Sequence, residues 1–201
     1  MKRILFFLSL CLAAVSWASA ETVVQYFDAG NPITYCGEKF HLAWSTRPYD
    51  FYILQEYLPE GETLDNYTQM FTVSVIFYGD APYNSAKAID MKIAELTERK
   101  KTDKICNWVV AENDGEKILD FIVSDGKDGR LDCVEADIHY YRDLVIEGHK
   151  ASVLLFYSRR AYGDDILPFI ESIPAQREKW YQGMTDLRLV PKFQFKHGFF
   201  I

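Results

Sequence analysis

The sequence predicts an α+β domain, built as an antiparallel β-sheet meander with helices packed on its faces. Two observations support this fold class. Four strand-like segments follow one another between residues 105 and 159, and only short turns join them. Two further stretches, one before and one after the meander, repeat apolar residues at helical spacing. Because short connections join antiparallel neighbours and parallel strands need a long crossover, we expect a single layered domain over residues 39–201.

The chain before residue 39 is expected to be an irregular leader, residues 21–38, because Asn31-Pro32 and Gly37 are turn signals. Residues 40–44 and 51–57 are rich in aromatic and aliphatic side chains that favour strands. We therefore predict a first hairpin there. After a turn, the alternating and β-branched stretch 71–78 predicts a further strand.

One helix is predicted between Asn84 and Lys101. Ile89, Ile93 and Leu96 recur at helical spacing, with charged residues on the opposite side. Asn84 or Ser85 can cap the first turn, since a short polar side chain accepts a hydrogen bond from a free backbone N–H there. This helix should pack one apolar stripe on the sheet.

The meander is the clearest part of the sequence. Its strand-like segments cover residues 105–111, 117–124, 131–141 and 150–159. Residues 113–115, 125–129 and 147–148 between them are of the types that accept a positive φ or bond locally. The last segment is apolar on both faces, which predicts a central strand covered on both sides.

A second helix is predicted after Asp164, which caps it. Its apolar residues at helical spacing are Ile166, Phe169, Ile170 and Ile173. Pro174 should end or kink this helix and open a second short one, which Gly183 closes. The tail from residue 193 to 201 is aromatic and alternates at Phe193 and Phe195.

The first 20 residues have the three parts of a secretory signal peptide: Lys2 and Arg3, an apolar run over residues 4–15, and a small-residue exit at Ala18-Ser19-Ala20. Cleavage near Ala20 would leave an exported protein, periplasmic or secreted. The apolar run is shorter than the roughly 20 residues that span a bilayer, so we expect no stable membrane insertion. The formal net charge of −7 argues against nucleic acid as a partner.

Three cysteines remain after such cleavage: Cys36, Cys106 and Cys133. No C-x-x-C occurs, so a thioredoxin-like motif and a clustered zinc site lack support. Cys106 and Cys133 fall in predicted strands of the same meander, and they are the candidate disulfide. The alternative is that all three are buried, unreactive thiols. No cofactor is predicted.

Glu135, Asp137 and His139 line one face of the predicted strand 131–141, opposite an apolar face. They are candidates for metal binding or acid–base chemistry. Neighbours on one strand face lie about 7 Å apart, so one small ion would need further ligands from an adjacent strand. A solvated or partly covered polar face is the simpler interpretation, and no metal site is predicted.

Arg159, Arg160 and Tyr162 end the last strand of the meander, next to the helix that starts at Asp164. Convergent arginines and free helix amides can bind a carboxylate or a phosphate. These three residues are therefore candidates for ligand binding. Salt bridges from the arginines to Asp164 and Asp165 are the alternative.

The segments Glu56-Tyr57-Leu58-Pro59-Glu60-Gly61-Glu62 and Asn66-Tyr67-Thr68-Gln69-Met70-Phe71-Thr72 resemble a stretch of uncharacterised exported proteins of Gram-negative bacteria. Those proteins carry an aromatic residue, often tryptophan, where this chain has Tyr67, which makes Tyr67 a fourth ligand-binding candidate. The order of elements resembles the PsbP/Mog1-like fold, an α/β/α sandwich. That resemblance implies an accessory or protein-binding module, and it brings no catalytic residue.

Three functions remain open. The sequence contains no Gly-x-Ser-x-Gly, Walker-type loop or His-Glu-x-x-His, and no catalytic residue is assigned. We predict a non-catalytic exported module that binds a protein or a small ligand in a groove beside the sheet. One alternative is a small hydrolase or metal-dependent enzyme that uses Asp137 and His139. The other is a secreted interaction or inhibitor protein that docks its partner through residues 193–201.

Overall fold

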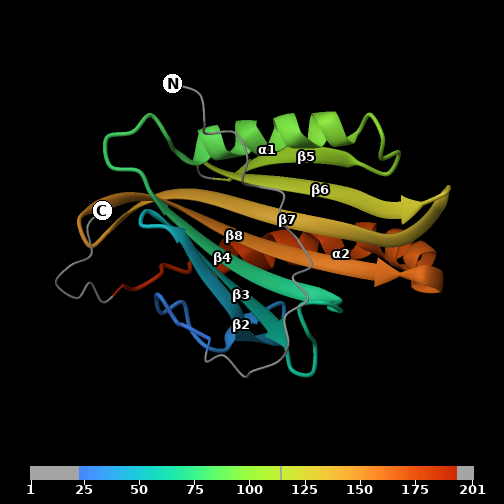
Figure 1. Cartoon of the computed structure of the whole chain (residues 1–201), viewed down its shortest axis with the longest axis horizontal. Helices are drawn as coiled ribbons and strands as arrows, with labels where there is room; N and C mark the ends of the chain where they lie inside the picture. Colours follow the sequence, from blue (N-terminus) through green and yellow to red (C-terminus); the bar gives the residue numbers. More distant parts are fainter. Residues whose placement is uncertain (1–22, 114, 194–201) are drawn as a thin grey trace.

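The computed structural model describes residues 23–113 and 115–193. They form one antiparallel sheet of eight strands in the order β1-β2-β3-β4-β8-β7-β6-β5 (Figure 1). Across the sheet, β1 to β4 follow one another from one edge to the middle, and β5 to β8 follow one another from the other edge to the middle. Strand β4 therefore pairs with β8 in the middle of the sheet. The two halves of the chain therefore meet in one sheet.

The first half contributes β1 (Ile33–Tyr35), β2 (Glu38–Tyr49), β3 (Tyr52–Pro59) and β4 (Gln69–Phe77). The predicted hairpin and the strand after it are confirmed. The prediction of an irregular leader missed β1 and its buried residues Ile33 and Tyr35. Register shifts in β2 at Leu42–Trp44 and at Thr46–Tyr49 bend and twist that strand.

The second half is the meander of β5 (Asn107–Asn113), β6 (Glu116–Lys127), β7 (Arg130–Ile146) and β8 (His149–Tyr162). All four predicted strands are confirmed, and β7 and β8 extend beyond their predicted ends. Glu147 and Gly148 form the two-residue turn between them, both with positive φ as such hairpins require. At the register shift in β6, a Cβ on Gly126 would lie 2.0 Å from the Arg130 carbonyl oxygen, so only glycine fits there.

Two α-helices accompany the sheet. Helix α1 (Ser85–Arg99) is capped by Asn84, whose side chain accepts a hydrogen bond from the Lys87 N–H at 2.9 Å, as predicted. A 3₁₀ turn (Gly163–Asp165) leads into α2 (Ile166–Asp186). The prediction that the helix ends at Pro174 and a second one opens there is wrong, because α2 is a single helix of 21 residues that includes Pro174. Buried residues on both sides of the proline, among them Ile173 and Trp180, stabilise the helix despite the hydrogen bond lost at Pro174.

The helices lie on opposite faces of the sheet. On the α1 face, Ala88, Ile89 and Leu96 pack with the side chains of Leu119, Phe121, Val123, Tyr141 and Leu154. On the α2 face, the helix residues Ile166, Phe169, Ile173, Trp180 and Met184 belong to a larger core that draws on strands from both halves of the sheet.

The predicted fold class, an α/β/α sandwich with helices packed on the sheet faces, is wrong. The structure is 50% strand and 23% helix, and its sheet is curled into a half-barrel. Helix α1 packs mainly on β6, β7 and β8, so it covers part of one sheet face and does not form a layer over the whole sheet. The curl brings β1 beside α2, where Tyr35 donates a hydrogen bond to the Trp180 carbonyl oxygen at 2.6 Å. Strands and not helices thus enclose much of the core.

Among the described residues, no helix is long and apolar enough to cross a membrane.

Candidate functional site

A row of ionisable side chains lies on the α1 face of β7 and β8. Alternation along β7 sends Glu135, Asp137 and His139 to this face, and the strand register places Arg160 opposite Glu135 and Ser158 opposite Asp137. Asp137 is 3% exposed and His139 is 7% exposed. The sequence predicted which residues share the face, and the structure adds that they are buried and paired across two strands.

Asp137 accepts a hydrogen bond from the Ser158 hydroxyl at 2.5 Å. Its other oxygen, Oδ2, is buried without a hydrogen-bond partner in the described part of the chain. Burial raises the pKa of Asp137 to about 6, because a carboxylate loses hydration in a low-dielectric interior. This carboxyl group is therefore a proton acceptor near neutral pH.

Glu135 forms an ion pair with the Arg160 guanidinium and accepts a hydrogen bond from the Tyr67 hydroxyl at 3.2 Å. The Arg160 guanidinium also lies 4.1 Å from the centre of the Tyr67 ring, which is cation–π geometry. Burial, and then repulsion by Asp137, raises the pKa of Glu135 to about 7. Burial likewise raises the pKa of Glu56, on β3, to about 7, against the opposing effect of Arg160.

His139 is packed in aromatic rings. Its ring stacks on Phe156 at a centroid distance of 3.9 Å and meets the edge of Phe121 at 4.7 Å. Its Nδ1 lies 3.3 Å from the Tyr141 hydroxyl, and its Nε2 lies 3.7 Å from Asp137 Oδ1. Burial lowers the pKa of His139 well below its usual value, so the ring is neutral.

These contacts bear on the chemistry that was considered for this row. Ser158 bonds to Asp137 and not to His139, so the hydroxyl and the imidazole do not form the nucleophile–base pair of a hydrolase. In the part of the chain that the structure describes, no group of three or more His, Cys, Asp or Glu residues is arranged to hold a metal ion. The row is a buried network of hydrogen bonds and one ion pair.

An open hollow of about 400 Å³ lies at the end of β8, where the chain turns into α2. Its lining residues are Thr68, Arg159, Arg160, Ala161, Tyr162, Asp165, Pro168, Phe169 and Ser172. Three of the four predicted ligand-binding residues thus lie in one hollow. The fourth, Tyr67, lies against it: its carbonyl oxygen accepts a hydrogen bond from the Tyr162 hydroxyl at 2.9 Å.

The two arginines of the hollow do not converge from the same side. Consecutive strand residues point to opposite faces, and accordingly Arg160 reaches Glu135 on the α1 face while the Arg159 guanidinium lies 5.9 Å from the Trp180 ring of α2. The alternative that was considered, salt bridges to Asp164 and Asp165, does not occur among the described residues. Arg159 is half-buried and forms no ion pair in the described part of the chain.

The candidate disulfide between Cys106 and Cys133 is absent from the structure. Cys36, Cys106 and Cys133 are free thiols. Cys106 precedes β5 and Cys133 lies on β7, with β6 between them, so their backbones are about 10 Å apart across two strand spacings. A disulfide needs Cα atoms within about 7 Å.

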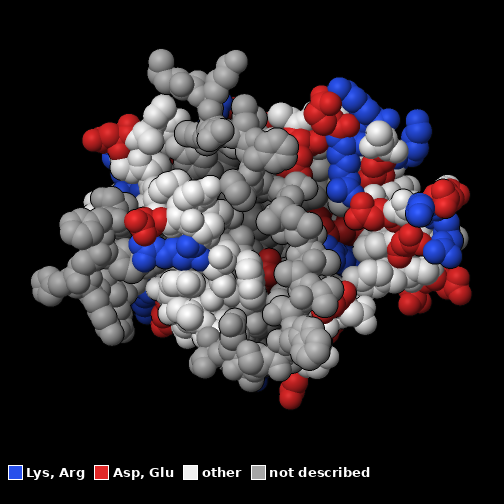
Figure 2. Space-filling view, viewed as in Figure 1, with Lys and Arg blue, Asp and Glu red and all other residues white. Residues whose placement is uncertain are grey.

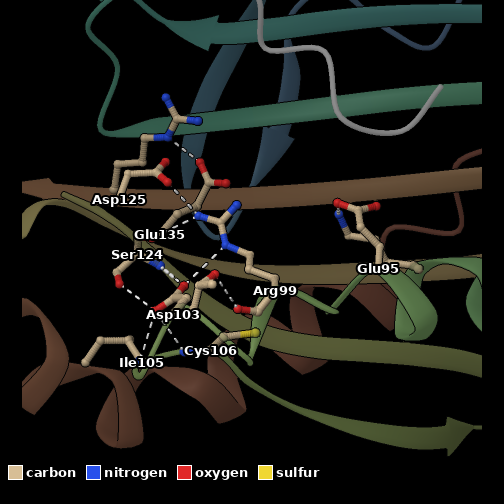
Figure 3. A network of polar contacts seen from close by, with 11 residues as sticks. Glu95, Arg99, Asp103, Ile105, Cys106, Ser124, Asp125 and Glu135 are labelled. Carbon is tan, nitrogen blue, oxygen red and sulfur yellow. Dashed lines mark hydrogen bonds and ion pairs between the residues drawn. The ribbon is translucent and has the colours of Figure 1, made fainter. Parts of the chain in front are cut away.

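A second polar network, which sequence reasoning missed, ties α1 to β6 (Figure 3). The Asp103 carboxylate accepts hydrogen bonds from the backbone N–H groups of Ile105, Cys106 and Ser124 and from the Ser124 hydroxyl. Arg99 pairs with Asp103 at 3.2 Å and with Asp125 at 2.8 Å. The i,i+4 spacing of Arg99 and Asp103 at a helix end was the available signal.

The tail prediction lies mostly outside the described residues. Phe193 is buried, and its ring packs against Phe27 at 5.2 Å and Phe77 at 5.1 Å. That residue therefore belongs to the protein's own core and is not free to dock a partner. Residues 194–201 and the signal-peptide prediction for residues 1–20 lie outside the described residues.

The fold and site define a class of protein: a curled antiparallel sheet with two helices, a buried acidic row and an open arginine-lined hollow. A family model matches residues 27–189, and the family is an uncharacterised bacterial one. The chain belongs to that family. A comparison with curated proteins finds no match, and neither does a comparison with solved structures, so the expected PsbP/Mog1-like resemblance has no support.

Proposed function

We propose that the protein is an exported, non-catalytic binding module, and that its ligand is a small molecule bearing a carboxylate or phosphate group. The ligand site is the hollow at the end of β8. The observation that carries this proposal is Arg159, a half-buried cation that lines the hollow and has no acidic partner among the described residues.

A guanidinium stays charged at all physiological pH values, and a partly buried charge without a counter-ion is unfavourable. Arg159 contacts two neutral groups, the Trp180 ring and the Tyr157 hydroxyl. Its Nε is buried and makes no hydrogen bond in the described part of the chain. A ligand oxygen would therefore supply the charge-assisted hydrogen bond that Arg159 lacks.

The start of α2 adds to this preference. Asp165, at the N-cap, makes no side-chain capping bond, and the dipole at a helix N-terminus favours an anion. Asp165 also lines the hollow, but it is exposed, and solvent and salt screen its repulsion. A volume of about 400 Å³ suits a small ligand.

Calorimetric titration of the purified protein with inorganic phosphate, and separately with citrate, tests this proposal. We expect saturable binding of one of them, weakened about tenfold or more by Arg159→Gln because a charge-assisted bond is lost. Arg130→Gln is the matched control: it removes the same charge from an exposed side chain on the nearby β6–β7 turn, and binding should be retained. The proposal would be refuted if neither phosphate nor citrate bound saturably, or if Arg159→Gln and Arg130→Gln weakened binding equally.

Export rests on the amino-terminal pattern and has its own test. Expression of the full chain in a Gram-negative bacterium, fractionation and amino-terminal sequencing should yield a periplasmic or secreted protein that begins at Glu21. An intact amino terminus in the cytoplasm would contradict export and leave the ligand proposal standing.

A further inference from the structure

Strand β5 forms an unprotected edge of the sheet. It pairs with β6 on one side, and no described strand pairs with the other. Val109 and Val110 are 56% and 41% exposed, although both are apolar and neighbours on a seven-residue strand. The opposite edge differs, because β1 has only three residues, follows Pro32 and has two of its three side chains buried. Proteins usually protect exposed edges with charge, proline or short length.

Helix α1 packs mainly on β6, β7 and β8, and the outer edge of β5 has no strand partner among the described residues. Trp108 and Val110 lie on the α1 face, because their partners on β6 are Phe121 and Leu119, which pack under α1. Glu112 shares that face by alternation. The Lys100 ammonium group, just past the end of α1, lies 5.0 Å from the centre of the Trp108 ring.

We propose that β5 pairs antiparallel with β5 of a second copy of this chain, about a two-fold axis at Val110. In this register Val110 faces Val110, Val109 faces Ala111, and Trp108 of each copy faces Glu112 of the other. Directly opposite residues share a face, so each Glu112 comes beside the Lys100 that covers the facing Trp108. The strand is therefore complementary to itself, with an apolar centre and an opposite-charge pair at each end.

The charges favour a second copy over an unrelated strand. Glu112 forms no ion pair among the described residues. In that part of the chain the Lys100 ammonium group contacts the neutral Asn107 side chain and the Trp108 ring and has no acidic partner. At the end of the molecule where α1 finishes, Lys and Arg side chains lie among Asp and Glu side chains (Figure 2). Because the β1 edge is short, pairing at β5 uses the one long free edge of the described sheet and should stop at a dimer.

Sedimentation velocity over a concentration series tests the proposal. We expect a concentration-dependent species of twice the monomer mass and none larger. Val110→Lys would place two ammonium groups opposite each other at the axis and should raise the dimer dissociation constant about tenfold or more. Val145→Lys is the matched control, because Val145 is 69% exposed on β7, away from the edge, and this variant should still dimerise.

A charge exchange tests the register. Glu112→Lys alone and Lys100→Glu alone should each weaken the dimer, and the double variant should restore it. Circular dichroism of each variant confirms that it is folded. A wild-type protein that stays monomeric at all concentrations, or a dimer that Val110→Lys leaves unchanged, would overturn the proposal. Neither outcome bears on the anion site, whose test is ligand binding.

Discussion

Gln55 is the side chain that fastens the amino-terminal segment to the sheet. It is 0% exposed, and its Oε1 accepts hydrogen bonds from the backbone N–H groups of Tyr26 at 2.7 Å and Phe27 at 3.2 Å. Its Nε2 donates to the Phe27 carbonyl oxygen at 3.3 Å and to the Tyr57 hydroxyl at 2.5 Å. Gln55→Leu keeps the size of the side chain and removes all four bonds.

The structure can respond to Gln55→Leu in two ways, and the response that costs less free energy sets the expected loss of stability. If the segment stays in place, three backbone groups are left unpaired at about 1–3 kcal/mol each. If it detaches, the cost is the burial of Phe27, about 2–3 kcal/mol, and its ring contact with Phe193, about 1 kcal/mol. Detachment limits the loss, so Gln55→Leu should lower the free energy of unfolding by about 3–4 kcal/mol.

Urea unfolding measures this loss, and limited chymotrypsin digestion distinguishes the responses, since only a detached segment is cut at Tyr26 or Phe27. Gln182→Leu is the control. Gln182 is exposed, and its side chain donates one hydrogen bond, to the exposed Asp186, so the change should stay within about 0.5 kcal/mol. If Gln55→Leu also stays within that range, the segment is not held by these bonds and the reasoning fails.

Three further predictions concern packing, pH and the α1 network. A Cβ on Gly183 would lie 2.8 Å from Cys36 Sγ, so Gly183→Ala should lower the free energy of unfolding in urea by about 1–2 kcal/mol, after the gain in helix propensity. Adding Cys36→Ala should recover most of this loss. A Gly183→Ala variant that is more stable than the wild type would contradict the close contact with Cys36. Burial raises the pKa of Glu135 to about 7, so the folded protein binds the carboxyl proton of Glu135 more tightly than the unfolded chain does. The stability that this proton adds is fully present below about pH 4.5 and is lost as the pH rises through about 7. The melting temperature of the wild type should therefore fall more from pH 5 to pH 8 than that of Glu135→Gln, and parallel curves would count against the shift. Asp103→Asn should lower the free energy of unfolding by about 2–4 kcal/mol, because the new amide N–H₂ group would face an N–H donor whose hydrogen bond the carboxylate accepts in the wild type. Backbone amide hydrogen exchange at Cys106 and Ser124 should become faster. Unchanged exchange at both residues would contradict this role of Asp103.

The parts of the fold that the sequence predicted are those set by neighbours in the chain. Helix α1 is capped by Asn84, one of the two residues predicted to cap it, and the meander follows from alternation and short turns. Pro174 shows the limit of this reasoning, because a local helix breaker was overridden by burial of residues on both sides of it. The curl of the sheet and the pairing of β4 with β8 depend on contacts between distant segments, and no local pattern encodes them.

The sequence also contains enough information to predict the pairing of Glu135 with Arg160 and the separation of Arg159 from Arg160. A two-residue turn at Glu147-Gly148 fixes the register of β7 and β8, because each step back from Ile146 is matched by one step forward from His149. Counting 11 residues back from Ile146 and 11 residues forward from His149 gives Glu135 and Arg160, which are opposite each other in the sheet. Alternation alone would also have separated Arg159 from Arg160 onto opposite faces.

What the register cannot give is the environment of each charge. Arg160 is neutralised because β8 places it against Glu135, whereas Arg159, one residue earlier, turns toward α2 and the Trp180 ring. The position of α2 depends on the curl of the sheet, which brings β1 and the Tyr35 hydroxyl to Trp180. The preference for an anion at Arg159 is thus a consequence of tertiary structure: the sequence supplies the cation, and only the fold decides that it has no carboxylate partner among the described residues.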